Sequence, residues 1–214
     1  MLIHPSLLFR FEAVIPETAA SAGESWTLAD QYATPNFLEL DGKPQPAQVQ
    51  FAMGWSPGGL FLQWSVRALT AKLPVNLSIG RLRFWIDSRG SIGIHRLTAS
   101  CTQFEFRYDI AAQKVTAVAH GSGRPKLAAE TDPIAAAGLT PRLDAGKGSF
   151  VVRSFLPATA MPGFQPDEFP NISYFYDLIC GDGSQIPASV GTQLKYDIDP
   201  GLWIRGVLRA KAGG

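Results

Sequence analysis

An alternation of apolar and polar side chains between residues 81 and 108 constrains this fold more than any other feature. Arg81–Asp87 and Gln103–Tyr108 each place an apolar residue at every second position. Side chains of a β-strand point to opposite faces with a period of two residues. Both segments therefore predict strands with one face in a core and one polar face. The polar set comprises Arg81, Arg83, Trp85 and Asp87 in the first segment and Gln103, Glu105 and Arg107 in the second.

Trp85 stands between Arg83 and Asp87 on this predicted polar face. An indole ring placed among charges without a partner leaves apolar area in water, which favours a ligand-binding surface here. The alternative is a cross-strand ion pair, such as Arg83 with Glu105, that the ring covers on a solvated sheet. Such a pair contributes at most about 1 kcal/mol. The residues alone leave both interpretations open.

Turn signals divide the rest of the chain into short segments, because its 214 residues include 21 Gly and 16 Pro. Ser56-Pro57-Gly58 predicts a hairpin between Gln48–Trp55 and Gly59–Arg67, with Trp64 in the core. Lys126–Ala137 is the one stretch of helical character. We predict a single all-β domain, residues 1–214, with the architecture of an antiparallel β-sandwich of jelly-roll or immunoglobulin-like type. Further strands are expected within Ser6–Ile15, Phe37–Leu40, Lys114–Ala119, Gly148–Leu156, Asn171–Ile179 and Trp203–Ala210.

Charge and composition exclude several classes of protein. The net charge of +1 argues against nucleic-acid binding, which needs a strong positive field. The sequence contains no run of about 20 apolar residues and no signal-peptide pattern, so we expect no membrane insertion. Cys101 and Cys180 are too few and too distant for a metal knuckle, and we expect two buried thiols.

Catalytic and metal-binding motifs give no support for an enzyme or a cofactor. The sequence has no G-x-S-x-G elbow, no HExxH and no phosphate loop. The three histidines lack zinc-ligand spacing. Turn carboxylates are the only candidates for calcium. We therefore expect a non-catalytic protein without a metal or cofactor, the calcium candidates being Asp177 with Asp182 and Asp197 with Asp199.

Several segments, taken in order, resemble a known family. GLFLQWSVR, RLRFWIDSRG, QFEFR, FVVRSFLP, ISYFYDLICGDG and DPGLWIRGVLR are similar to the strands of the family 9-like carbohydrate-binding modules of the DOMON-like superfamily. The resemblance covers about residues 48–210 and extends to stand-alone bacterial members of that group. It implies a β-sandwich. It also implies binding of a sugar between two Trp rings with Arg, Glu, Gln and Asn side chains around them.

Carbohydrate binding is the function that the resemblance and the alternation together favour. One ring would be Trp85, and Trp55, Trp26 and Tyr32 are the choices for a second. A structural or protein-interaction sandwich without a sugar site is the alternative. It predicts that Trp85 is covered by another subunit or by the chain's own loops, especially Ala158–Pro170. A third hypothesis is haem binding, with Met53 and either His95 or His120 as the iron ligands. The expected ligand-binding residues are Arg83, Trp85, Glu105, Arg107, Gln103, Gln63 and Trp55.

Overall fold

Two β-sheets pack face to face in the computed structural model, which describes residues 12–34, 47–70, 72–120, 138–188 and 194–211. Among these residues the larger sheet has seven strands in the order β1-β11-β9-β4-β5-β6. The short strand β10 pairs with the second half of β9. The bounds are Glu12–Pro16 for β1, Ile79–Asp87 for β4, Cys101–Asp109 for β5, Lys114–His120 for β6, Asn171–Cys180 for β9, Gln185–Pro187 for β10 and Ile204–Arg209 for β11.

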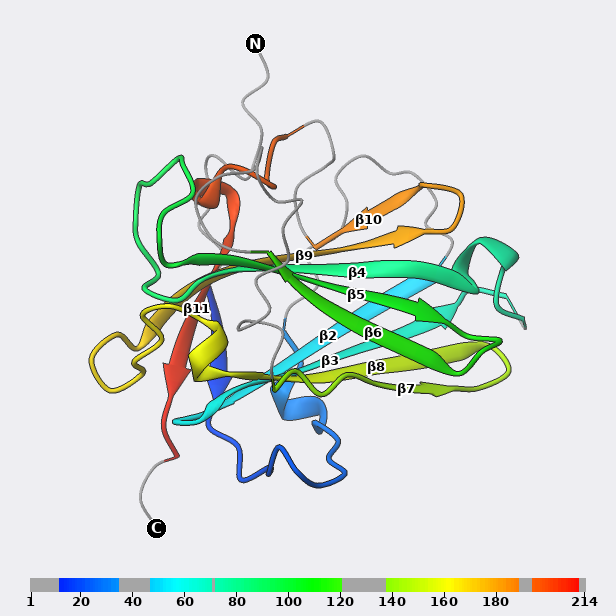
Figure 1. The fold of residues 1–214 in the computed structure, drawn as a ribbon, viewed down its shortest axis with the longest axis horizontal. Helices are drawn as coiled ribbons and strands as arrows, with labels where there is room; N and C mark the ends of the chain where they lie inside the picture. Colours follow the sequence, from blue (N-terminus) through cyan, green and yellow to red (C-terminus); the bar gives the residue numbers. More distant parts are fainter. Residues whose placement is uncertain (1–11, 35–46, 71, 121–137, 189–193, 212–214) are drawn as a thin grey trace.

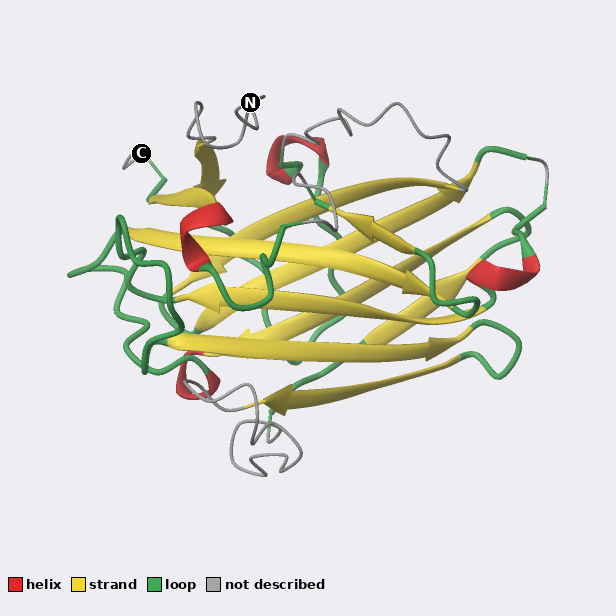
Figure 2. Cartoon of the chain, turned by 90° about the horizontal axis from the view of Figure 1, so that it is seen from above, coloured by secondary structure: helices red, strands yellow, loops and turns green. Residues whose placement is uncertain are grey.

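The smaller sheet has four described strands in the order β2-β3-β8-β7. The hairpin expected around Ser56-Pro57-Gly58 joins β2 to β3, and the two pair over their whole lengths. In Figures 1 and 2 the strands of the larger sheet cross over those of the smaller sheet. The all-β sandwich predicted from the sequence is confirmed. The bounds are Ala47–Ser56 for β2, Gly59–Ala68 for β3, Arg142–Ala145 for β7 and Ser149–Pro157 for β8.

Aromatic side chains from both sheets fill the space between them. Trp64 of β3 is fully buried, as expected, and its ring centroid lies 5.3 Å from that of Phe106 on β5. The ring centroids of Phe51 on β2 and Tyr176 on β9 are 4.5 Å apart. Burial of this apolar area is the main stabilising contribution to a sandwich. Cys101 and Cys180 are both buried and free, which confirms the expectation of two buried thiols.

Among the described single-turn 3-10 helices, η3, η5 and η6 lie next to strand ends, whereas η2 lies in the connection between β1 and β2. Trp26 and Tyr32, the last residue of η2, pack over the outer face of the smaller sheet. The ring centroids of Trp26 and Phe61 are 5.1 Å apart there. None of the described helices is long and apolar enough to cross a membrane. Their bounds are Asp30–Tyr32 for η2, Val75–Leu77 for η3, Ala158–Ala160 for η5 and Pro200–Leu202 for η6.

Two features differ from the sequence prediction, and two predicted segments lie outside the described residues. β1 pairs with β11 in parallel, so the larger sheet is mixed and not purely antiparallel. β7 and β10 have only four and three residues, too short for an alternation pattern to reveal. The predicted strand Phe37–Leu40 and the helical stretch Lys126–Ala137 lie outside the described residues.

Asp87 ends β4 with the turn that its sequence suggested. Its two carboxylate oxygens accept hydrogen bonds from the backbone N–H groups of Arg89 and Ser91, at 3.1 and 2.9 Å. The Ser100 hydroxyl donates a third bond of 2.6 Å. Gly90 takes a positive φ of 54° in this turn. Asp87 is 1% exposed, so its carboxylate has a structural role at the strand end.

Candidate functional site

The outer face of the larger sheet carries most of the predicted site residues. In β4, Leu82, Phe84 and Ile86 point into the core. The outward positions of β4, β5 and β9 line up in register, Arg81 with Arg107 and Ile179, and Arg83 with Glu105 and Asp177. The sheet therefore brings Arg83, Trp85, Gln103, Glu105 and Arg107 onto one surface.

One part of this surface is closed by an ion pair. Two nitrogens of the Arg83 guanidinium bind the Asp177 carboxylate, with Nε 2.9 Å from Oδ1. The Tyr196 hydroxyl donates a 2.7 Å hydrogen bond to Oδ2 of Asp177. Asp177 is 0% exposed. Asp177 of β9, and not Glu105, is thus the cross-strand partner of Arg83.

The ion pair and its burial change the pKa values of Arg83 and Tyr196, the two residues that bind Asp177. Desolvation opposes the charge of Arg83, but the hydrogen bond and the negative charge of Asp177 outweigh it and raise the pKa of Arg83. Burial, followed by the charge of Asp177, raises the pKa of Tyr196 above its ordinary value. Arg83 therefore stays charged and Tyr196 stays a neutral donor.

Trp85 lies in the same closed part. It is 2% exposed, and the Arg83 guanidinium stands 4.8 Å from its ring centroid. The Tyr196 ring packs edge-on against Trp85 at 5.7 Å and stacks on Phe175 at 4.3 Å. Trp203 anchors this segment by donating a 2.7 Å hydrogen bond from Nε1 to the Tyr196 carbonyl.

The sequence suggested that Trp85 is exposed on the polar face, and this prediction is wrong because the ring is buried. The ring is covered by the chain itself, as the structural alternative anticipated, but Tyr196 lies outside the loop Ala158–Pro170 that was expected to supply the cover. Its burial against Arg83 and Tyr196 makes Trp85 a packing group in this structure.

A second part of the surface is open and carries the exposed arginines. Glu105 is 5% exposed and accepts a 2.6 Å hydrogen bond from Nε of Arg107. An Nη atom of Arg81 lies 3.6 Å from the other Glu105 oxygen. The side chains of Arg81 and Arg107 are 45% and 63% exposed. One buried carboxylate thus orients two guanidinium groups that still face solvent.

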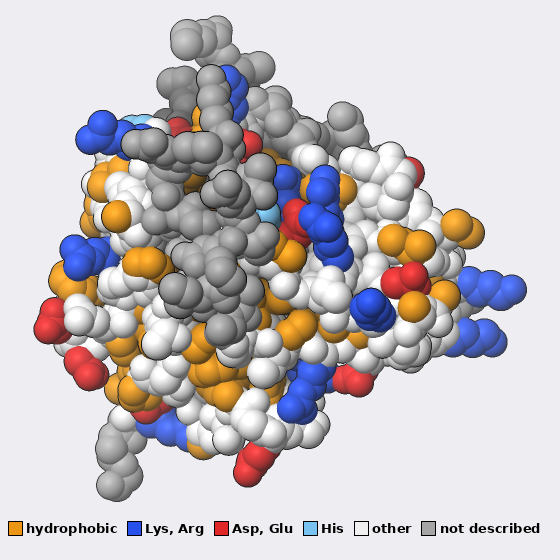
Figure 3. Space-filling view, in the orientation of Figure 1, with side chains coloured by type: hydrophobic (Ala, Val, Ile, Leu, Met, Phe, Trp, Pro, Cys, Tyr) orange, Lys and Arg blue, Asp and Glu red, His pale blue; other side chains and the backbone are white. Residues whose placement is uncertain are grey.

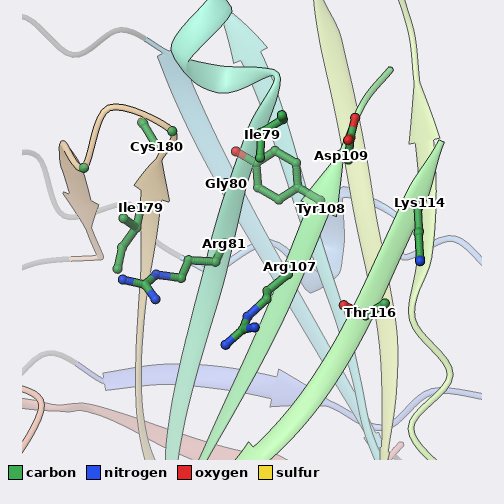
Figure 4. A pocket seen from close by; sticks show the side chains of 12 residues that line it. Ile79, Gly80, Arg81, Arg107, Tyr108, Asp109, Lys114, Thr116, Ile179 and Cys180 are labelled. Atoms are coloured by element: carbon green, nitrogen blue, oxygen red, sulfur yellow. The ribbon is translucent and has the colours of Figure 1, made fainter. Parts of the chain in front are cut away.

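A groove of about 580 Å³ lies beside these two arginines. It runs along the first residues of β4 and β6, the last residues of β5 and β9, and the turn before β10. Figure 4 shows Arg81 and Arg107 on neighbouring strands, with the Arg81 guanidinium beside Ile179. In the orientation of Figure 1, the space-filling view of Figure 3 shows several Lys and Arg side chains in its right half, with Asp and Glu side chains among them. The groove residues used below are Arg81, Arg107, Tyr108, Lys114, Thr116 and Ile179.

The two remaining predicted site residues lie on the smaller sheet and make structural contacts. Gln63 is buried, and its amide accepts from the Leu28 N–H and donates to the Leu28 carbonyl, at 3.1 and 3.2 Å. Trp55 donates from Nε1 to the Arg209 carbonyl. The structure therefore does not bring Gln63 or Trp55 to the arginine surface. The alternation showed that Gln63 points outward but could not show from which sheet.

Three of the four carboxylates named as calcium candidates form hydrogen bonds with protein groups. Asp177 binds Arg83, Asp182 accepts from Ser184 and Asn76, and Asp199 accepts from the Gly201 N–H and faces His95 Nδ1 at 3.0 Å. Within the described ranges, no three His, Cys, Asp or Glu side chains form a group that could hold a metal ion. Of the haem candidates, Met53 is fully buried in the core and His95 lies in an exposed loop.

Comparison with known proteins identifies the fold. No protein-family model and no curated protein matches this sequence. Two solved structures of a carbohydrate binding module family 9 (CBM9) from Caldicellulosiruptor kristjanssonii match nearly the whole chain. The complex with cellotriose has a TM-score of 0.59 over 94% of this chain and 95% of its own. The complex with glucose has a TM-score of 0.60 over 95% and 98%, and the identity is 7% in both. This chain has a CBM9-like fold.

The CBM9-like fold confirms the family resemblance read from the strand motifs, at the level of the fold. Sequence reasoning missed two groups around the site. Tyr196 follows no strand pattern, and its contact with Trp85 arises from a loop. Lys114 and Thr116 belong to a predicted strand, but their place in the groove depends on β6 pairing with β5. The alternation of β6 was the available signal.

Proposed function

We propose that this protein is a non-catalytic carbohydrate-binding module whose ligand lies in the groove on the open part of the larger sheet. One observation carries the proposal. Arg81 and Arg107 expose guanidinium donors that Glu105 holds in place beside a groove of about 580 Å³, a size typical of small-ligand sites. Preoriented donors suit sugar hydroxyls because less side-chain entropy is lost on binding.

The CBM9-like fold supports the same proposal, since the two similar structures hold cellotriose and glucose. Of the residues predicted from the sequence, Arg107 is the proposed binding residue in this groove, and Glu105 is proposed to orient it. Gln103 pairs in register with Trp85 of the closed part and lies outside the groove lining. Arg83 and Trp85 are proposed to support the groove from the closed part, by fixing β4 against β9. A non-catalytic role agrees with the absence of nucleophile and metalloprotease motifs in the sequence.

A glycan array followed by calorimetry tests this proposal. The wild-type protein should bind at least one class of glycan. Arg107→Ala should weaken that binding about ten-fold or more, because one charge-assisted hydrogen bond is worth about 1.5–3 kcal/mol. Arg67→Ala is the matched control, an exposed arginine on the outer face of the smaller sheet that should leave binding unchanged. A wild type that binds none of the neutral and charged glycans contradicts the proposal.

A second function is favoured by one observation, the burial of Trp85 under Tyr196. A sandwich whose aromatic platform is covered by its own chain can serve as a structural or protein-interaction module without a sugar site. This alternative predicts a blank glycan array together with self-association in sedimentation velocity. A monomer that binds a glycan with dependence on Arg107 excludes it.

A further inference from the structure

Two exposed arginines of the groove share one carboxylate. Arg81 and Arg107 are direct Cα partners on adjacent strands, and like charges in that position repel each other. Both depend on Glu105 alone among the described acidic groups that contact them. Two exposed guanidinium groups therefore share one buried carboxylate.

Lys114 adds a third cation along the same groove. It faces Asp109 in register, and Asp109 Oδ1 accepts a 3.0 Å hydrogen bond from the Ala112 N–H in the turn between β5 and β6. Thr116 is the direct Cα partner of Arg107 and supplies a hydroxyl to the same surface. The groove lining thus includes three cations and the Thr116 hydroxyl, with Asp109 as the carboxylate among the described lining residues, while the buried Glu105 binds the two arginines from outside the lining.

The described residues at this groove present no exposed aromatic ring for stacking. Tyr108 borders it, but its ring is 2% exposed and packs on Phe150 at 4.7 Å. The large exposed apolar side chains that the structure describes are all aliphatic, and Ile79 is the one at the groove. Neutral sugars are usually held through a ring face, as aromatic stacking contributes apolar contact that hydroxyl bonds lack. Recognition here has to come from charge and hydrogen bonds.

We propose, on the basis of the proposed carbohydrate-binding function, that the groove selects an acidic saccharide, one whose sugar carries a carboxylate. A planar guanidinium group binds a carboxylate through two parallel N–H···O bonds, and such charge-assisted bonds are about twice as strong as neutral ones. Glu105 engages Nε of Arg107, which leaves the outer nitrogens of that guanidinium facing solvent for a ligand. Thr116 and the outer nitrogens of Arg81 are within the same groove to bind sugar hydroxyls.

Calorimetry with matched oligosaccharides tests this inference on the full chain. The probes are trigalacturonic acid, its methyl ester with the same skeleton and no charge, cellotriose, and a sulfated disaccharide. Trigalacturonic acid should bind at least ten-fold more tightly than its methyl ester, and its affinity should fall as sodium chloride rises. Arg107→Gln should abolish that preference, and Arg67→Ala should keep it.

The outcomes separate this inference from the proposed function. Equal or tighter binding of cellotriose or the methyl ester overturns the acidic-saccharide inference and leaves carbohydrate binding in place. Preference for the sulfated disaccharide overturns the carboxylate assignment. Failure of every probe and of a wider glycan array overturns both. Circular dichroism of Arg107→Gln must match the wild type, and Thr116→Val provides a second variant, expected to weaken binding of both the acid and its ester.

Discussion

Asp177 has the most consequential side chain on the outer face of the larger sheet. It is fully buried and binds both the Arg83 guanidinium and the Tyr196 hydroxyl. A buried ion pair of this kind adds little stability relative to a pair of apolar side chains of similar volume. Removing one partner, however, leaves the charge of the other buried and uncompensated. The carboxylate thus fixes Tyr196 over Trp85 and determines which part of the face is closed.

Replacing Asp177 should therefore be costly. We expect Asp177→Asn to lower the free energy of unfolding by about 3–5 kcal/mol, since Arg83 would keep a largely buried charge without its partner. Urea denaturation monitored by tryptophan fluorescence measures the change. Glu12→Gln is the control, because Glu12 lies 3.6 Å from Arg205 with half of its side chain exposed, and it should cost less than about 1 kcal/mol. Equal effects of the two substitutions would contradict the assigned role of Asp177.

At the residue scale, the sequence predicted which face of the sheet a side chain points to better than it predicted which residues are in contact. The alternation placed Leu82, Phe84 and Trp64 correctly in the core. It could not show that Arg83 meets Asp177, because 94 residues separate them and the order of strands in the sheet decides the contact. Tyr196 was missed for the same reason, since a loop segment has no periodicity that reports what it covers.

The turn between β9 and β10 is the element whose stability depends most clearly on acid pH. Asp182 accepts hydrogen bonds from the Ser184 hydroxyl and N–H at 2.6 and 2.9 Å and from Asn76 at 2.8 Å. These bonds, the Ser184 hydroxyl first, lower the pKa of Asp182 to about 2. The turn joins the strand that carries Asp177 to β10 and borders the groove through Gly181 and Gly183.

A carboxyl group whose pKa is lower in the folded state stabilises the fold above its unfolded pKa and loses that contribution as the pH falls. The stability supplied by Asp182 should therefore disappear between about pH 4 and pH 2. The unfolding free energies of the wild type and Asp182→Asn should differ above about pH 4 and converge near pH 2, in urea titrations at each pH. Asp167→Asn, an exposed loop carboxylate, controls for the loss of one charge. Curves that stay parallel down to about pH 2 would contradict the role of Asp182.

Strand length determined how well whole elements could be predicted. The strands of nine or ten residues, among them β2, β3, β4 and β9, are long enough for a two-residue period to stand out. β7 and β10 are too short for it. The parallel pairing of β1 with β11 left no trace in either segment, because it depends on the path of the whole chain.

At the scale of the molecule, one core connects both sheets, and it includes residues from β1 near the beginning to β11 near the end. We therefore expect the chain to unfold as one domain. Tryptophan fluorescence and far-ultraviolet circular dichroism should give the same midpoint in urea, as a two-state transition requires. Two separate transitions would contradict the prediction of a single domain spanning residues 1–214.

The groove could be predicted only in part at this scale. The pattern in β4 and β5 identified Arg107 and Glu105 as outward residues on one surface, and the register confirms that they share a face with Arg81. The hollow beside them is built by β6, β9 and the turn at Gly181, which come together only in the folded sheet. A pattern within single strands contains no information on that arrangement.

The pairing of β1 with β11 also has a consequence for synthesis of the protein on the ribosome. β11 follows all the other described strands along the chain, and it separates β1 from β9 in the larger sheet. Until residues 204–209 have left the exit tunnel, β1 lacks its neighbour among the described strands of this sheet and the first half of β9 has a free edge. Unpaired edges of this kind attract other chains. The nascent protein thus remains exposed to misassociation until β11 is released and pairs with β1 and β9.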